Sequence, residues 1–187
     1  MKKSQSIINA ENLGITLKNV KTFEGHDTMQ GFNADVYING KLAFHAFDAA
    51  YGGCYEYSPA KKGQRNCEIH EVIQGLEEKL KVSPKYKTML GSKEYEFQDN
   101  LDMVISALVS DFEIQKGIKK DSKKGILICR GDLGYDIIKW NLTIPNMIKR
   151  YGIDRMLPSI QKAVMECQAK KEEILNVEYL KSIGVKF

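Results

Sequence analysis

The chain has 187 residues, of which 43% are hydrophobic and 28% are charged. These values are close to ordinary globular usage, and they exclude a disordered chain, a collagen-like repeat and a disulfide-stabilised miniprotein. With 28 Lys and Arg residues against 24 Asp and Glu residues, the net charge is only +4 and the pI is near 8.7, so total charge alone does not define a nucleic-acid-binding protein.

Three features of the sequence bear on where the protein is found: the length of its apolar runs, the polarity of its first residues and the spacing of its cysteines. No apolar run approaches the ~18–20 residues that a membrane span needs, and the first residues turn polar before a signal-peptide core can form. The 4 cysteines are irregularly spaced, as is typical of reduced thiols rather than of a disulfide framework. We therefore expect a cytoplasmic protein in a reducing compartment, without membrane association.

The N-terminal part is expected to form a meander of strands. Residues 13–23 alternate imperfectly between apolar and polar side chains, as a strand does when a bulge lies near Asn19. Two further β-rich runs, residues 31–38 and 41–47, are separated by Asn39-Gly40, a pair that tolerates the positive φ angles of a type I′ turn. The pattern predicts a tight hairpin that turns at these residues.

A turn of this kind fixes which side chains share a face of the hairpin. The expected core face consists of opposed pairs, which are Ile38 with Lys41, Val36 with Ala43, Ala34 with His45 and Phe32 with Phe47. The opposite face then carries Tyr37, Leu42 and Phe44. Because that face is too apolar to be left entirely to water, we expect a helix or a partner to cover it.

Helical periodicity follows in the middle of the chain. Apolar residues from 69 to 80 recur with helical spacing after Asn66, an expected N-cap, and this helix is predicted to end near Lys81. A stronger apolar stripe over residues 97–112 predicts a second helix that Gly117 is placed to stop.

The C-terminal part is expected to contain a second hairpin, over residues 126–129 and 135–142, and then helices over 145–152, 158–175 and 177–183. Strands and helices are segregated, and the strands are joined as hairpins rather than by crossovers. The sequence therefore predicts an α+β fold in a single domain, residues 1–187, with an N-terminal antiparallel meander, two helices, a second β-hairpin and C-terminal helices.

Basic residues cluster in two places that are candidate binding sites. Lys61, Lys62 and Arg65 lie ahead of the first long helix, where helix amide groups favour a phosphate. The second cluster projects a local positive potential and consists of Lys116, Lys119, Lys120, Lys123 and Lys124. The ordinary explanation for both clusters, which we prefer, is a solvated loop that keeps the protein soluble.

Residues that would carry out a reaction are few. Candidate metal ligands are His45, Cys54, Cys67 and His70. Cys67 and His70 are separated by two residues and could chelate a metal, but a structural zinc site usually has two such pairs, and His45 and Cys54 lie nine residues apart. The Walker pattern is also absent, and we expect no metal and no cofactor. Cys67 with His70, or acidic residues such as Asp99 and Asp102, leave a small enzyme open as an alternative.

The segment Phe32-Asn33-Ala34-Asp35-Val36-Tyr37-Ile38-Asn39-Gly40-Lys41, followed by Gly52-Gly53-Cys54, resembles a pattern in small uncharacterised proteins of bacteriophages and mobile elements. Proteins of this kind are often accessory factors that bind and block a host macromolecule, including components of host defence. The resemblance implies a host-defence inhibitor, for example an anti-CRISPR protein, and it brings no catalytic residues.

The leading hypothesis is a non-enzymatic binding protein that docks on and inhibits a host protein or nucleoprotein through Tyr37, Leu42 and Phe44, together with the basic clusters. The apolar residues would supply buried area, and the lysines would steer the protein toward acidic or nucleic-acid surfaces. The first alternative is a nucleic-acid-binding module that contacts phosphates through the same basic clusters. The second is a small enzyme with a Cys/His or carboxylate site.

Overall fold

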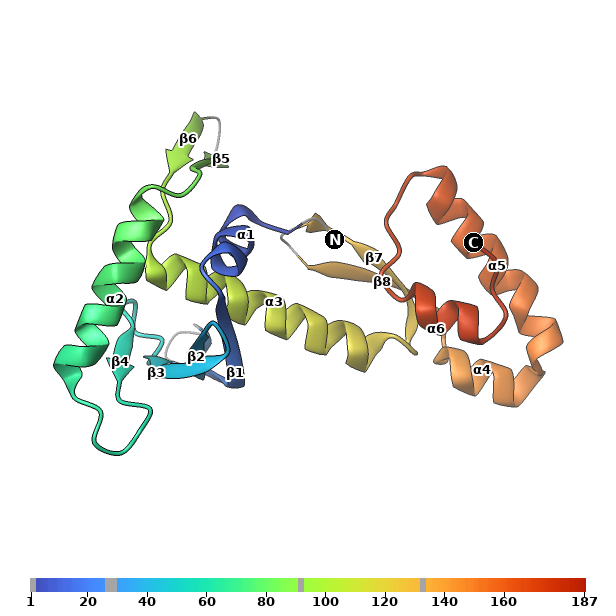
Figure 1. Ribbon diagram of the computed structural model, residues 1–187. Helices are drawn as coiled ribbons and strands as arrows, with labels where there is room; N and C mark the ends of the chain where they lie inside the picture. The colour runs from blue at the N-terminus through green and yellow to red at the C-terminus, as the bar shows by residue number, and fades with distance from the viewer. Residues whose placement is uncertain (1–2, 26–29, 91–92, 132–133) are drawn as a thin grey trace. The chain divides into compact units, whose positions relative to one another are not determined.

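The computed structural model describes residues 3–25, 30–90, 93–131 and 134–187 (Figure 1). It is an α+β structure with antiparallel sheets, which confirms the predicted fold class. The chain divides into two compact units, an N-terminal unit of residues 3–112 and a C-terminal unit that contains residues 113–187. The single domain stays a prediction. None of the described helices combines the length and the apolar character needed to cross a membrane.

The N-terminal unit contains a four-stranded meander, a separate hairpin and helices. Its elements are α1 (Gln5–Asn12), β1 (Ile15–Glu24), β2 (Gln30–Ile38), β3 (Lys41–Asp48), β4 (Glu56–Ser58), α2 (Asn66–Lys81), β5 (Tyr86–Leu90), β6 (Lys93–Phe97) and the first part of α3 (Leu101–Asp121). The strands of the meander are hydrogen-bonded in the order β1-β2-β3-β4. The sequence predicted the first strands of this meander, and it did not predict α1, β4 or the β5–β6 hairpin.

Local features of the meander match their predictions. Asn39 and Gly40 have φ angles of 49° and 77°, as a type I′ turn requires. Asn19 has a φ angle of 52° and lies where the pairing of β1 with β2 shifts, between Lys18 and Lys21. The turn and the bulge in β1 are therefore confirmed.

The predicted register of the β2–β3 hairpin is correct only next to the turn. Ile38 pairs with Lys41 as expected, but Val36 pairs with Phe44 instead of Ala43. Ala43 is the extra residue of a β-bulge, and one inserted residue reverses the face on which every later side chain of the strand lies. Phe44 is therefore fully buried in the core, and its predicted place on the open face is wrong.

A side chain from the loop before α2 forms a hydrogen bond with the backbone of the bulged residue Ala43. The Gln64 Nε2 group donates to the Ala43 carbonyl oxygen at 2.7 Å, and Gln64 Oε1 accepts from the Ala60 N–H at 3.0 Å. A bulged residue leaves backbone groups without a ladder partner, so this contact compensates for the irregularity. It also fixes the loop over residues 59–65 to β3.

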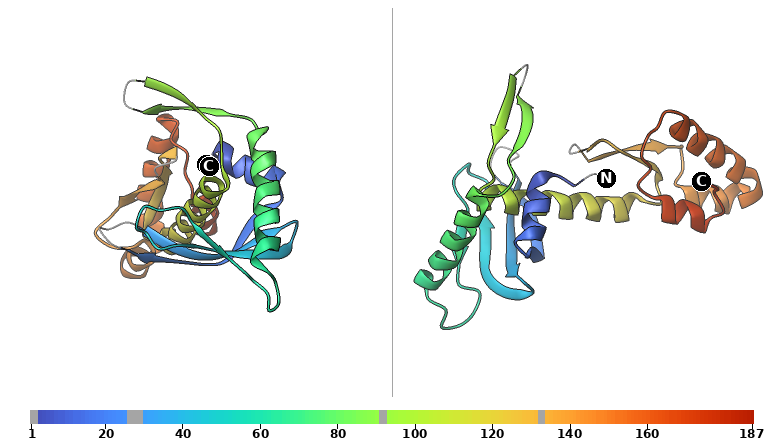
Figure 2. Two further views of the ribbon diagram at one scale, coloured as in Figure 1. Left: turned by 90° about the vertical axis from the view of Figure 1, so that its left-hand side faces the viewer. Right: turned by 45° about the horizontal axis from the view of Figure 1, so that its top comes forward.

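The core of the N-terminal unit lies between one face of the meander and the three helices (Figures 1 and 2). The buried side chains of this core come from every layer and include Ile15, Phe32, Val36, Phe44, Leu76, Leu80, Leu101, Val104 and Ile105. The first long helix, α2, has the predicted bounds, although Arg65 rather than Asn66 is its N-cap.

The C-terminal unit contains the end of α3, β7 (Gly125–Cys129), β8 (Tyr135–Lys139), α4 (Ile144–Tyr151), α5 (Ile153–Ala169) and α6 (Val177–Ser182). β7 and β8 form the predicted second hairpin, and β7 is largely buried as expected. α4 and α6 match their predicted ranges approximately. The prediction for α5 is wrong at both ends, because the helix starts before Pro158 and ends at Ala169 rather than at residue 175. α3 also continues past Gly117, its predicted end, to Asp121.

A segment after α5 completes the hairpin of the C-terminal unit. Ile174 forms a bridge with Ile128, and the Leu175 N–H donates to the Leu127 carbonyl at 2.9 Å. The next residue, Asn176, is buried and bonds three backbone groups through its side chain. Its side-chain amide thus holds the turn after α3, the start of β7 and the start of α6 together.

Candidate functional site

The outer face of the meander is the side of the β1–β4 sheet turned away from the helical layer (Figure 2). Cross-strand pairing assigns its residues, because opposed residues of an antiparallel pair lie on the same face. From β1 to β3 they are Thr16, Lys18, Lys21, Phe23, Gly31, Asn33, Asp35, Tyr37, Leu42, His45 and Phe47. Its aromatic residues are not among the side chains that pack on the core of this unit.

Aromatic rings from β1 and β3 meet across β2 on this face. The ring centroids of Phe23 and Phe47 are 6.0 Å apart, with an angle of 26° between the ring planes. Gly31 of β2 lies opposite Phe23, and a Cβ at Gly31 would approach the Phe23 ring to 2.5 Å. The missing side chain therefore lets the rings stack over the strand. Phe23 is still 39% exposed, so the pair presents aromatic surface to solvent.

We expect Gly31→Ala to destabilise the N-terminal unit by about 1–3 kcal/mol, because the added methyl group would displace the Phe23 ring and press on the Asp48 carbonyl oxygen. Urea unfolding followed by circular dichroism measures the change. Gly53→Ala is the matched control, since a Cβ at Gly53 meets no atom within 4 Å. Equal free energies of unfolding for the two variants would show that the Phe23–Phe47 contact does not depend on the absence of a side chain at residue 31.

Tyr37 and Leu42 lie on the outer face as predicted, and both are partly buried. The Lys18 Nζ atom lies 4.4 Å from the centroid of the Tyr37 ring, which is a cation–π contact. A positive charge therefore lies directly beside aromatic surface.

The acidic residue between the aromatic groups is engaged within the sheet. One carboxylate oxygen of Asp35 lies 2.6 Å from His45 Nδ1, and the other accepts from Asn19 Nδ2 at 2.7 Å. Hydrogen-bond donors on two neighbours hold this carboxylate in place. Asp35 therefore keeps a negative charge on the outer face, directly opposite Lys18.

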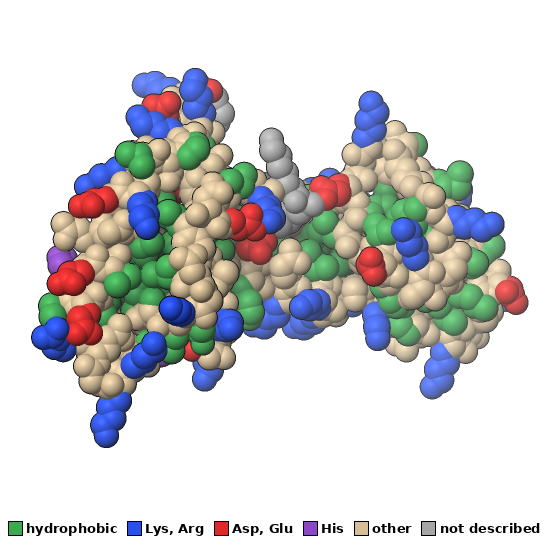
Figure 3. Space-filling view, in the orientation of Figure 1, with side chains coloured by type: hydrophobic (Ala, Val, Ile, Leu, Met, Phe, Trp, Pro, Cys, Tyr) green, Lys and Arg blue, Asp and Glu red, His purple; other side chains and the backbone are tan. Residues whose placement is uncertain are grey.

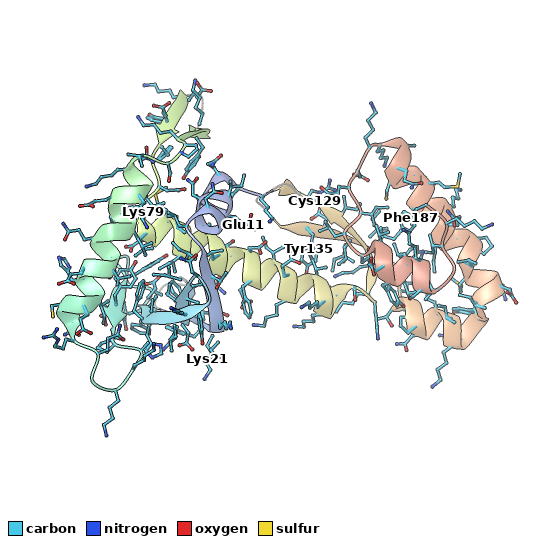
Figure 4. All side chains as sticks on the ribbon, viewed as in Figure 1. Glu11, Lys21, Lys79, Cys129, Tyr135 and Phe187 are labelled. Atoms are coloured by element: carbon cyan, nitrogen blue, oxygen red, sulfur yellow. The ribbon has the colours of Figure 1, made fainter. Side chains whose placement is uncertain are left out.

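Lysines surround the outer face. Lys18 and Lys21 project from β1 on this face, and both are exposed. In Figure 4 the Lys21 side chain extends on the side of the sheet away from α3. The loop that contains Lys61 and Lys62 extends past the sheet in the same direction, and Lys and Arg side chains gather along this edge in Figure 3. Only Lys61 and Lys62 were predicted as site residues.

The third predicted residue of this loop, Arg65, forms an ion pair. Its Nε group lies 2.9 Å from a Glu68 carboxylate oxygen, and its backbone N–H lies 3.4 Å from the other oxygen. Hydrogen bonds from the Arg65 side chain and backbone lower the pKa of the Glu68 carboxyl group. Arg65 is therefore already paired with an acid at the start of α2, where a phosphate was predicted to bind.

The second basic cluster lies at the end of α3 and in the turn that follows it, within the C-terminal unit. Lys116 pairs with Glu113 at 2.9 Å, and Lys124 pairs with Asp121 at 2.6 Å. The Tyr135 hydroxyl also donates to Asp121, and burial together with this bond raises the pKa of Tyr135 to about 12. The remaining members, which are exposed, are Lys119, Lys120 and Lys123.

The candidate residues for metal binding and thiol chemistry do not converge. Cys54, Cys67 and His70 are exposed, and His45 contacts Asp35 on the outer face. Within the described ranges, no group of at least three His, Cys, Asp or Glu residues is arranged to hold a metal ion.

The acidic residues that were considered as candidate catalytic groups, Asp99 and Asp102, form hydrogen bonds within the fold. Asp99 is buried and accepts from Ser6 Oγ and Asn9 Nδ2, each at 2.7 Å, which ties α1 to the start of α3. Asp102 accepts from the Tyr57 hydroxyl and from the Tyr55 N–H. Burial and the bond to Asp102 raise the pKa of Tyr57, so its hydroxyl stays a donor in this contact.

Comparison with known proteins finds no match to this chain among family models, curated proteins or solved structures. Function is therefore inferred from the surfaces of the molecule. The resemblance to phage and mobile-element proteins stays a prediction.

Proposed function

We propose that this chain is a non-enzymatic nucleic-acid-binding protein whose binding surface is the outer face of the meander. The observation that carries the proposal is the combination on that face of three aromatic rings with nearby lysines; Phe23 is exposed, and Phe47 and Tyr37 are partly buried. Lysines bind the phosphate backbone, and aromatic rings contact bases.

Electrostatics supplies the larger part of such an affinity. Each lysine that neutralises a phosphate releases a counterion, so log K falls linearly with log salt concentration by about 0.9 for each contact on duplex DNA and about 0.7 on a single strand. The exposed lysines on or near the outer face are Lys18, Lys21, Lys61 and Lys62. Binding through several of them would be strong at low salt and would weaken steeply as salt is added.

The test is fluorescence anisotropy of labelled DNA and RNA oligonucleotides titrated with the full chain at several salt concentrations. The double variant Lys61→Gln/Lys62→Gln should weaken binding several-fold at low salt and reduce the salt slope by about 1–2. The matched control is Lys85→Gln/Lys87→Gln, because these exposed lysines are paired with Glu96 and Glu94 on the β5–β6 hairpin. Absence of binding to every oligonucleotide at low salt would refute the proposal.

Docking on a host protein or nucleoprotein, including a host-defence complex, stays a prediction. Burial of Phe44 removes one of the three apolar residues on which it was based, and Tyr37 and Leu42 are partly buried. A protein-directed inhibitor does not require nucleic acid, so the oligonucleotide titration separates the two functions.

A further inference from the structure

We infer that the outer face of the meander binds single-stranded nucleic acid in preference to duplex, with bases stacked on Phe23, Phe47 and Tyr37. This inference rests on the proposed nucleic-acid-binding function and specifies which form of nucleic acid is bound. In a duplex the faces of the bases are covered by their neighbours, whereas an unpaired strand exposes them to aromatic side chains.

The aromatic residues on the outer face lie far enough apart to contact more than one base at a time. Phe47 is paired with Asn33 on β2, and Tyr37 lies further along the same strand. Four residues of extended strand correspond to roughly 13 Å, so a base on the Phe23–Phe47 pair and a base on Tyr37 would not overlap. The polar groups of Asn33, Asp35 and His45 lie between the two positions on the same face.

Lysines lie near Tyr37 and Phe23, whereas Phe47 is paired with the exposed Glu56 of β4. Lys18 lies over the Tyr37 ring, and Lys21 shares β1 with Phe23. A strand whose bases face the sheet would bring its phosphates past these lysines. Rings for the bases and cations for the backbone are the elements that single-strand-binding surfaces combine.

The shape of the surface disfavours a duplex. The major groove of B-DNA is about 12 Å wide and admits a helix or a two-stranded ribbon. Four strands spaced about 4.8 Å apart form a surface roughly 14 Å across between the outer strand axes, before side chains are counted. Such a face would contact a duplex only along its backbone and would leave the rings without a base to stack on.

The β5–β6 hairpin carries a competing aromatic group. Tyr86 and Phe97 stack with centroids 6.0 Å apart, and Tyr95 is 44% exposed. On this hairpin, however, Lys85 and Lys87 lie 3.3 Å and 2.9 Å from glutamates of the opposite strand. The positive charge of these two lysines is therefore locally compensated on the hairpin.

The test compares one sequence of about 20 nucleotides, longer than a typical site, as single-stranded DNA, single-stranded RNA and duplex DNA. Anisotropy titrations of the full chain should show a single strand bound about tenfold more tightly than the duplex. The DNA and RNA strands identify the natural source, because a protein that contacts the 2′-hydroxyl prefers RNA.

Variants then locate the site. Phe23→Leu and Phe47→Leu keep an apolar side chain but remove the aromatic face, and each should weaken single-strand binding by about tenfold. The salt slope should stay unchanged, because no phosphate contact is lost. Phe187→Leu is the matched control, since Phe187 is 45% exposed and lies beside Lys181 in the C-terminal unit.

Outcomes of the titrations separate this inference from the proposed function. Equal binding of duplex and single strands, or wild-type affinity in both leucine variants, would overturn stacking on the outer face while leaving nucleic-acid binding intact. Loss of affinity in Tyr95→Leu instead would place the bases on the β5–β6 hairpin and would also overturn the inference. Failure of every oligonucleotide to bind would refute the proposed function itself.

Discussion

Phe44→Ala is expected to destabilise the N-terminal unit by about 3–5 kcal/mol, the usual cost of removing a buried aromatic ring. Phe44 is fully buried, pairs with Val36, and meets the Tyr57 ring edge-on with centroids 5.3 Å apart. Urea unfolding measures the total loss. Hydrogen exchange should show faster amide exchange in β2 and β3 than in the wild-type protein, with little change in β7.

The matched control for this variant is Phe47→Ala, which makes the same chemical change on the same strand. Phe47 lies on the outer face beyond the bulge at Ala43, where it contacts Phe23. We expect it to cost about 1–2 kcal/mol, because less of its ring is removed from water, and to weaken oligonucleotide binding. A larger loss of stability for Phe47→Ala than for Phe44→Ala would mean that the register is the unbulged one.

Local signals were sufficient to predict the turn, the first bulge and the first long helix. Asn39-Gly40 and Asn19 adopt positive φ angles that few other residues tolerate, so their positions can be read from sequence. The bulge at Ala43 differs, because a distant side chain, Gln64, satisfies its carbonyl oxygen. No pattern within β3 itself contains that information, and the prediction for Phe44 failed for this reason.

The elements that were not predicted are held by polar contacts between distant residues. α1 places Ser6 and Asn9 in the interior, where both bond Asp99. Hydrophobic periodicity treats such residues as exposed, so it does not reveal the helix. The β5–β6 hairpin contains cross-strand Lys–Glu pairs, which a search for hydrophobic periodicity does not detect.

The candidate site was predicted in part. Tyr37, Lys61 and Lys62 were selected because they are conspicuous within their own segments. Phe23 and Phe47 come from different strands and become a pair only through the β1–β2 and β2–β3 registers and the missing side chain at Gly31. A surface assembled across strands therefore requires the registers to be known before its members can be named.

Asn176→Ala is expected to destabilise the C-terminal unit by about 3 kcal/mol, because it leaves buried backbone groups without partners. The Asn176 Nδ2 group donates to the Ser122 and Gly125 carbonyl oxygens at 2.7 Å and 2.8 Å. Its Oδ1 atom accepts from the Leu127 N–H at 3.0 Å. Since Asn176 is only 4% exposed, water cannot readily replace these bonds in the folded state.

Hydrogen exchange can assign the effect of Asn176→Ala to a particular part of the chain. The Leu127 amide should exchange faster by about two orders of magnitude, as a loss near 3 kcal/mol implies, while amides of β2 should keep their protection. Asn146→Ala is the matched control, because Asn146 is exposed on α4 and its replacement should change stability by less than about 0.5 kcal/mol. Equal stability of the two variants would show that the Asn176 side chain does not hold β7 to α6. A loss of protection that included β2 would instead show that the N-terminal and C-terminal units unfold together.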